Sequence, residues 1–124
     1  MFEWRDEGGR IVSLRYQGTE LLFQPDGPAN DDEFYGSGWD EMLGSVEACE
    51  MDLSGYGRIC FPDHGEAWRE RWHGRFEGKI LPYVFERRLR CEGRDLLVEY
   101  SFLNAGRHPI PCFWAMHPVM VGRP

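Results

Sequence analysis

Stretches in which apolar and polar residues alternate recur along this 124-residue chain, and such alternation is typical of half-buried β-strands. The three clearest stretches are residues 9–16, 83–91 and 96–103. Further strands are expected at residues 20–23, 67–74, 75–81 and 110–116. No window longer than a few residues has the periodicity of a helix.

Turns rich in glycine, asparagine or proline separate these predicted strands. Residues 17–19 join the first two strands into a hairpin, and residues 93–95 and 104–109 form later turns. Residues 45–52 fit either a short strand or a turn. Longer irregular segments are expected at residues 24–32, 36–42 and 54–65. About eight strands with short connections predict an all-β protein, an antiparallel β-sandwich in which residues 1–124 form a single domain.

Composition and charge narrow the functional classes. The chain is 42% hydrophobic and 15% aromatic, which supports a globular core. Its net charge of −7 argues against a nucleic-acid partner, because phosphate backbones bind clustered positive charge. No apolar run approaches the roughly 20 residues that a membrane-spanning helix needs, so we expect no membrane partner.

The four cysteines predict a reducing compartment. Cys49, Cys60, Cys91 and Cys112 form no CxxC pair, and the polar start of the chain does not have the pattern of a secretory leader. We therefore expect reduced, mostly buried thiols in a cytoplasmic protein.

A first candidate for a functional site is the segment Pro-Asp-His-Gly-Glu at residues 62–66. It places the imidazole of His64 between the carboxylates of Asp63 and Glu66 in a glycine-containing loop. Loops on a rigid scaffold often carry the polar residues of a binding site. The alternative is a surface turn in which Asp63 is a cap and His64 is solvated.

A second candidate is His117, at the end of the aromatic segment 113–118. A histidine at a strand end beside Trp114 would donate a hydrogen bond to a ligand oxygen while the ligand stacks on the indole ring. The alternative is a core histidine that bonds to a backbone carbonyl. Strand alternation places Trp114 on the same face as Met116.

Metal binding is a rival use of these side chains. His64, Glu66 and His117 contain the two imidazoles and one carboxylate that suit iron and other transition metals. However, neither histidine has a second histidine nearby in the sequence, and the cysteine and histidine spacings of zinc sites are absent. Phosphate-binding glycine loops and nucleophile elbows are absent as well. We therefore predict no metal ion and no other cofactor.

The beginning of the chain resembles a known family. Residues 8–14 (G-G-R-I-V-S-L) and 18–22 (G-T-E-L-L) resemble the opening hairpin of aldose 1-epimerases, which belong to the galactose-mutarotase-like superfamily. The segment 62–66, with tryptophans at 68 and 72, is similar to the loop that holds the first sugar-site histidine of these proteins. Residues 97–104, followed by two prolines and His117-Pro118, are similar to the stretch that holds the second.

The resemblance implies a large antiparallel β-sandwich with a monosaccharide or sugar derivative bound on its concave face. The implied reaction is acid–base opening of a pyranose ring, with His117 as the general acid and His64 as a hydrogen-bond donor that orients the sugar. The other implied substrate-binding residues are Asp63, Glu66 and Arg69, with Trp114 as the stacking surface.

The family also implies what this chain lacks. Its members are roughly twice as long, near the upper end for one all-β domain, and their catalytic carboxylate base lies in the later half. The chain therefore resembles the N-terminal half, and its residues show no catalytic base. A half sandwich exposes an apolar face and open strand edges, so we expect a homodimer or larger homo-oligomer that completes the sandwich between chains.

The expected function follows from the implied sugar site and from the absence of a visible catalytic base. The chain is expected to be a mutarotase-like, carbohydrate-binding domain, and an aldose 1-epimerase only if another chain completes its site. The alternative is a structural or interaction β-domain without a sugar function.

Overall fold

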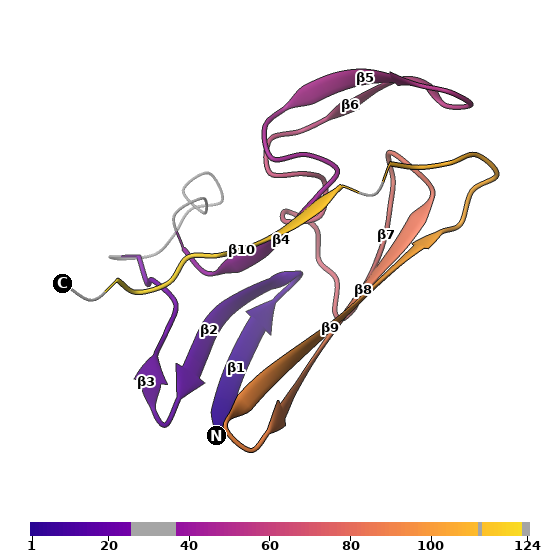
Figure 1. The fold of residues 1–124 in the computed structure, drawn as a ribbon. Helices are drawn as coiled ribbons and strands as arrows, with labels where there is room; N and C mark the ends of the chain where they lie inside the picture. Colours follow the sequence, from indigo (N-terminus) through magenta and orange to yellow (C-terminus); the bar gives the residue numbers. More distant parts are fainter. Residues whose placement is uncertain (26–36, 112, 123–124) are drawn as a thin grey trace.

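The structure, a computed structural model, describes residues 1–25, 37–111 and 113–122, and these residues form ten strands and no helix (Figure 1). The strands are β1 (Phe2–Glu7), β2 (Arg10–Tyr16), β3 (Thr19–Glu20), β4 (Trp39–Leu43), β5 (Cys49–Leu53), β6 (Gly57–Phe61), β7 (Arg75–Glu77), β8 (Tyr83–Glu92), β9 (Asp95–Asn104) and β10 (Trp114–Pro118). The prediction of an all-β protein is confirmed.

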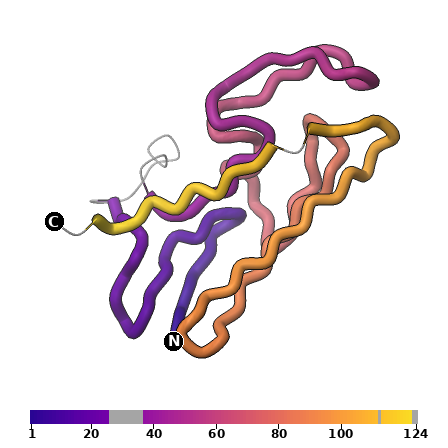
Figure 2. Tube along the Cα trace, viewed as in Figure 1, coloured from indigo at the N-terminus to yellow at the C-terminus, as the bar shows by residue number. Residues whose placement is uncertain are grey.

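The strands form two main sheets and a separate hairpin, and every strand pair is antiparallel. The first sheet has the order β1-β2-β4-β10, with β3 paired to β2, and the second has the order β7-β8-β9. The β5–β6 hairpin extends away from both (Figure 1). The long β8–β9 hairpin reaches past the first sheet to the N-terminus, where the Cys91 thiol lies 3.4 Å from the carbonyl oxygen of Phe2 (Figure 2).

Alternation along β8 selects the residues that face the first sheet. Tyr83, Phe85 and Arg87 are buried, while the residues between them are more exposed. On β9 the directly opposite residues are Phe102 for Phe85 and Tyr100 for Arg87, and cross-strand partners lie on the same face of a sheet. The two strands therefore present an apolar face that is interrupted by one guanidinium group.

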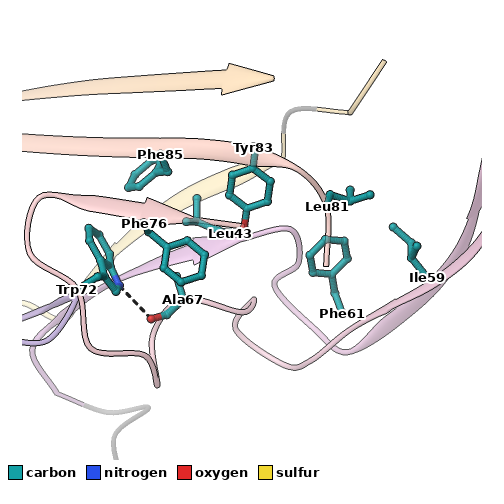
Figure 3. Packing of buried hydrophobic residues seen from close by; sticks show 9 residues of the cluster. All are labelled: Leu43, Ile59, Phe61, Ala67, Trp72, Phe76, Leu81, Tyr83 and Phe85. Atoms are coloured by element: carbon teal, nitrogen blue, oxygen red, sulfur yellow. Dashed lines mark hydrogen bonds between the residues drawn. The ribbon is translucent and has the colours of Figure 1, made fainter. Parts of the chain in front are cut away.

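Two apolar clusters fill the space between the elements. The larger core joins β4, the β5–β6 hairpin, the β6–β7 loop and the second sheet (Figure 3). Its buried members are Leu43, Ile59, Phe61, Ala67, Trp72, Phe76, Leu81, Tyr83 and Phe85. The smaller core lies between the first sheet and the far end of the β8–β9 hairpin, and its buried members are Ile11, Leu14, Leu22 and Trp39.

Trp72 shows how tightly the larger core is closed. Its indole N–H donates to the carbonyl of Ala67 at 3.1 Å, a bond that both ends need because they are buried. Gly9 lies directly against the indole ring, and a side chain at this position would overlap it. A glycine is therefore required by the approach of the β1–β2 turn to Trp72.

A buried ion pair crosses between the two sheets. The side chains of Glu41 on β4 and Arg87 on β8 are 0% and 2% exposed, and Arg87 Nη1 lies 3.1 Å from Glu41 Oε1. The Tyr100 hydroxyl and the Trp114 indole N–H also donate to this carboxylate, at 2.9 and 2.8 Å. Burial raises the pKa of Glu41, and these donors with the charge of Arg87 limit the rise.

A second carboxylate fixes the β2–β3 hairpin. Glu20 accepts hydrogen bonds from the Ser13 hydroxyl at 2.5 Å and from the backbone N–H groups of Leu14 and Leu22 at 2.9 and 3.2 Å. Burial opposes ionisation of Glu20, but these hydrogen bonds, that of Ser13 foremost, outweigh it and hold its pKa below the usual value.

The strands predicted from the clearest alternation are confirmed. Residues 9–16, 83–91 and 96–103 correspond to β2, β8 and β9, and the turns between them lie where predicted. The predicted strand at 20–23 is reduced to β3 and an isolated bridge between Leu22 and Met120. The strand predicted at 110–116 lies closer to the C-terminus in the structure, as β10.

Three other sequence predictions are wrong. The segment predicted as irregular at 36–42 contains β4, the segment predicted as a loop at 54–65 contains β6, and residues 67–74 form no strand. β1 was not predicted, because its polar residues hide the alternation. Residues 26–36, which include most of the irregular segment predicted at 24–32, lie outside the described residues.

We predict that Arg87→Met destabilises the protein by about 3–5 kcal/mol, because it leaves the carboxylate of Glu41 buried without its cation. Adding Glu41→Gln should restore part of this loss, since the amide oxygen still accepts from Trp114 and Tyr100 without a buried charge. Arg88→Met, on the exposed face of β8, is the control. Urea unfolding measures the free energy of unfolding of the wild type, the two single variants and the double variant. Equal losses for Arg87→Met and Arg88→Met would contradict the prediction.

We predict that Glu20→Gln loses about 1–3 kcal/mol at neutral pH, where Glu20 is ionised and hydrogen-bonded. Because the folded-state pKa of Glu20 lies below the unfolded value, its contribution is present above the unfolded pKa and is lost as pH falls through the folded pKa. Unfolding free energies of both proteins across acidic and neutral pH should therefore converge in acid. A difference that is independent of pH would contradict this assignment.

Candidate functional site

Asp40 and His117 lie directly opposite each other on neighbouring strands of the first sheet. Directly opposite residues of an antiparallel pair share a face, so the two side chains meet. The distance from His117 Nδ1 to Asp40 Oδ1 is 2.9 Å, that of a hydrogen bond. Asp40 follows Trp39 and precedes Glu41, and alternation turns its carboxylate away from the interior between the sheets.

The loop between β6 and β7 brings His64 to the same carboxylate. Gly65 forms a bridge with Leu43, and a side chain on Gly65 would overlap the Leu43 backbone. The backbone N–H of His64 donates to the carbonyl of Val46 at 2.7 Å, and the N–H of Glu66 donates to the carbonyl of Leu43 at 3.1 Å. These bonds attach the loop to the end of β4.

The backbone of His64 itself adopts a left-handed conformation, with φ at 62°, which is uncommon for a residue with a side chain. This conformation directs the imidazole toward Asp40, where His64 Nδ1 lies 3.5 Å from Oδ2. Such conformations persist where the surrounding contacts fix them, and they concentrate at functional sites.

Asp40, His64 and His117 form one compact group, which we call the histidine–aspartate cluster. The two imidazole rings lie 5.1 Å apart between centroids and are nearly perpendicular, at 82°. Exposure increases outward, from 5% for the Asp40 side chain to 16% for His64 and 33% for His117. Both rings direct Nδ1 at the carboxylate, so each Nε2 lies on the far side of its ring, away from Asp40.

Arg10 on β2 adds a positive charge close to the cluster. Its side chain is buried, and its Nη2 donates to the carbonyl of Ser37 at 2.5 Å. Burial lowers the pKa of Arg10, and the negative charges of Asp40 and Glu7 oppose that shift. The carboxylate of Asp40 therefore balances the guanidinium charge as well as binding the histidines.

The structure separates the other expected substrate-binding residues of this region from the cluster. Asp63, Glu66 and Arg69 line a hollow of about 420 Å³, together with Trp68. The Arg69 guanidinium lies 4.4 Å from the centre of the Trp68 ring, a cation–π contact. Trp68 connects the two regions, because its ring also lies 6.2 Å from that of His64.

Glu66 has a structural role that the sequence did not indicate. Its carboxylate accepts from the backbone N–H groups of Lys79 and Ile80 at 3.3 and 3.1 Å, and from the hydroxyl of Tyr83. Burial and the hydrogen bond to Glu66 raise the pKa of the Tyr83 phenol. These contacts join the loop to the turn before β8, and they leave Asp40, not Glu66, as the carboxylate beside the histidines.

Trp114 lies on the opposite face of β10 from His117. It donates to Glu41, and its ring lies 4.4 Å from that of Tyr100, between the two sheets. The expected face shared by Trp114 and Met116 is confirmed by their common contact with Tyr100. The structure therefore does not bring Trp114 to the histidines, because a separation of three residues changes the face of a strand.

Asp40 is the site residue that sequence reasoning missed. It lies in the segment predicted as irregular, where the adjacent acidic residues Asp40 and Glu41 suggest a solvated loop. The available signal was the sequence Trp-Asp-Glu-Met-Leu, whose apolar residues surround both acids.

Comparisons with known proteins add no relative: no family model, no curated protein and no solved structure matches the chain. Within the described residues, no helix is long and apolar enough to cross a membrane. Cys49, Cys60 and Cys91 are free thiols, but Cys60 is exposed and the other two are only partly buried, so the expectation of mostly buried thiols is wrong for these three. Cys112 lies outside the described residues.

Proposed function

We propose that the histidine–aspartate cluster binds a monosaccharide or a sugar derivative and that the chain is a mutarotase-like, carbohydrate-binding domain. The observation that supports this most directly is the meeting of His64 and His117 at one buried carboxylate. The two histidines come from distant segments, each of which resembles a sugar-site segment of aldose 1-epimerases. The family resemblance and the geometry therefore select the same two side chains.

The cluster has the chemistry that sugar hydroxyls require. A neutral imidazole that donates Nδ1–H to Asp40 exposes an acceptor at Nε2, and a protonated imidazole exposes a donor there. Histidine changes between these states near neutral pH. Two Nε2 atoms, one on each ring, thus match the mixed donors and acceptors of a pyranose.

Interconversion of anomers needs two proton transfers. A base removes the proton of the anomeric hydroxyl, the bond between C1 and the ring oxygen breaks, and an acid protonates that oxygen. The open aldehyde then rotates and closes as the other anomer, with the proton transfers reversed. His117, the more exposed histidine, is the proposed acid, Asp40 holds it in place, and His64 orients the sugar.

The proposed base is supplied from outside this cluster. In the resembled family a later carboxylate removes the anomeric proton, and Glu66 is already bound by backbone N–H groups and Tyr83. We therefore propose sugar binding for the chain itself and aldose 1-epimerase activity only where another chain completes the site. Free thiols at three cysteines are compatible with the cytoplasm.

The proposed partner is a second copy of the chain. Among the described strands, β9 and β10 each pair on one side only, and they lie near each other through the contact between Tyr100 and Trp114. Unpaired strand edges favour association, and exposed apolar residues on or near them do so as well. These residues are Leu103, Phe113, Met116, Met120 and Val121.

We predict that an aldose titrated into the protein changes its tryptophan fluorescence saturably, because Trp68 lies beside His64. His117→Ala should weaken the apparent affinity about tenfold or more, since a hydrogen-bond partner of the sugar is lost. His108→Ala is the control, because the His108 ring lies outside the cluster and packs edge-on against Tyr56, with 5.6 Å between the ring centroids. No response to any of a panel of aldoses would contradict sugar binding and favour a structural domain.

Exchange between anomers, followed by NMR, tests the enzymatic part separately. Rates equal to those of the free sugar, with binding intact, would leave the chain a binding domain and remove the epimerase proposal.

We predict a homodimer at micromolar concentration by multi-angle light scattering. Leu103→Lys should shift the equilibrium toward monomer, because a lysine on an edge strand opposes pairing. Trp4→Lys, on β1 at the other edge of the first sheet, is the control. A stable wild-type monomer would contradict the proposal.

A further inference from the structure

The three side chains of the histidine–aspartate cluster are also a set of metal ligands. Imidazole nitrogens suit divalent zinc, copper, iron and nickel, and two imidazoles with one carboxylate leave coordination positions open on such an ion. From the sequence we weighed His64, Glu66 and His117 as such a set and predicted no metal ion, but the structure places Asp40, not Glu66, beside the two histidines. We propose that Asp40, His64 and His117 bind one divalent transition-metal ion.

The spacings of the two imidazoles from the Asp40 carboxylate agree with ligation of a single ion. Asp40, His64 and His117 each offer a ligand atom, and these atoms lie within 4.8 Å of one another. Metal–ligand bonds of about 2.1 Å place two ligand atoms roughly 3.0 Å apart at a right angle and roughly 3.4 Å apart at a tetrahedral angle. The observed spacings are 2.9 Å from His117 Nδ1 to Asp40 Oδ1 and 3.5 Å from His64 Nδ1 to Oδ2, the other oxygen of the same carboxylate.

The ligands are held before any ion arrives, which lowers the cost of binding. Asp40 is in the middle of a sheet, between β2 and β10, and His117 is its cross-strand partner. His64 is held by the bonds of its loop to Val46 and Leu43. Burial favours a bound cation beside Asp40, because a buried carboxylate is stabilised by a nearby positive charge.

Two features set the character of the site. The one-third exposed ring of His117 leaves an outward side, where water or a ligand oxygen would complete the coordination, as in metal sites with three protein ligands. Arg10 already places a positive charge near Asp40, which weakens binding of a second cation. We therefore expect an exchangeable ion with an open position.

Metal binding does not depend on the proposed sugar function. An ion on the two Nδ1 atoms would replace their hydrogen bonds to Asp40, so the proposed acid role of His117 belongs to the metal-free cluster. Metal binding is measured without sugar, so a failure of the metal proposal can be distinguished from a failure of the sugar proposal.

The test is a titration of the reduced, chelator-treated protein with Co²⁺, followed by visible absorption, with Zn²⁺ as competitor. We expect saturation at one ion per chain, displacement by Zn²⁺ and no thiolate charge-transfer band. His117→Ala, which removes a ligand, and Asp40→Asn, which replaces the anionic carboxylate by a neutral amide, should each weaken binding roughly 100-fold. His73→Ala is the matched control, because His73 is an exposed histidine 3.8 Å from another carboxylate, that of Asp6.

Unfolding midpoints of the variants establish that each is folded. Should Asp40→Asn fail to fold, the partly exposed His117 still provides the decisive variant. The absence of a saturable Co²⁺ spectrum, a thiolate band, or unchanged binding by folded His117→Ala would each overturn the proposal.

Discussion

The ion pair between Glu41 and Arg87 is the interaction on which the arrangement of the two sheets depends. It occupies the middle of an otherwise apolar interface, where an unpaired charge would be strongly destabilising. The carboxylate also accepts from Tyr100 and Trp114, so four side chains from β4, β8, β9 and β10 meet at one group. Only one relative position of the sheets satisfies all of them, whereas apolar contacts alone would tolerate several.

Strand β4 connects the ion pair of Glu41 and Arg87 to the candidate site. Asp40 and Glu41 are adjacent, and strand alternation directs one carboxylate toward each face of β4. Glu41 fixes β10 from the inner face through Trp114, and Asp40 meets His117 of β10 on the outer face. The loop of His64 joins the end of β4 through Leu43. The position of both histidines therefore depends on how β4 is held by the buried pair.

The sequence predicts those parts of the fold in which local pattern and environment agree. β8 and β9 alternate clearly because each has one buried and one exposed face. β4 was missed because both of its faces are covered, and Asp40 and Glu41 are buried through partners distant in the sequence. His64 and His117 were singled out from the sequence, but their meeting at Asp40 depends on the pairing of β4 with β10, which no local pattern contains.

The central claim is that one carboxylate, Asp40, orients both imidazoles. The most direct measurement is a long-range ¹⁵N NMR spectrum of the histidine rings of metal-free protein, at a pH where the rings are neutral. The account predicts that His117 carries its proton on Nδ1 in the wild type and on Nε2 in a folded Asp40→Asn variant, with His64 changing in the same direction. A wild-type spectrum in which both rings carry the proton on Nε2 would contradict it.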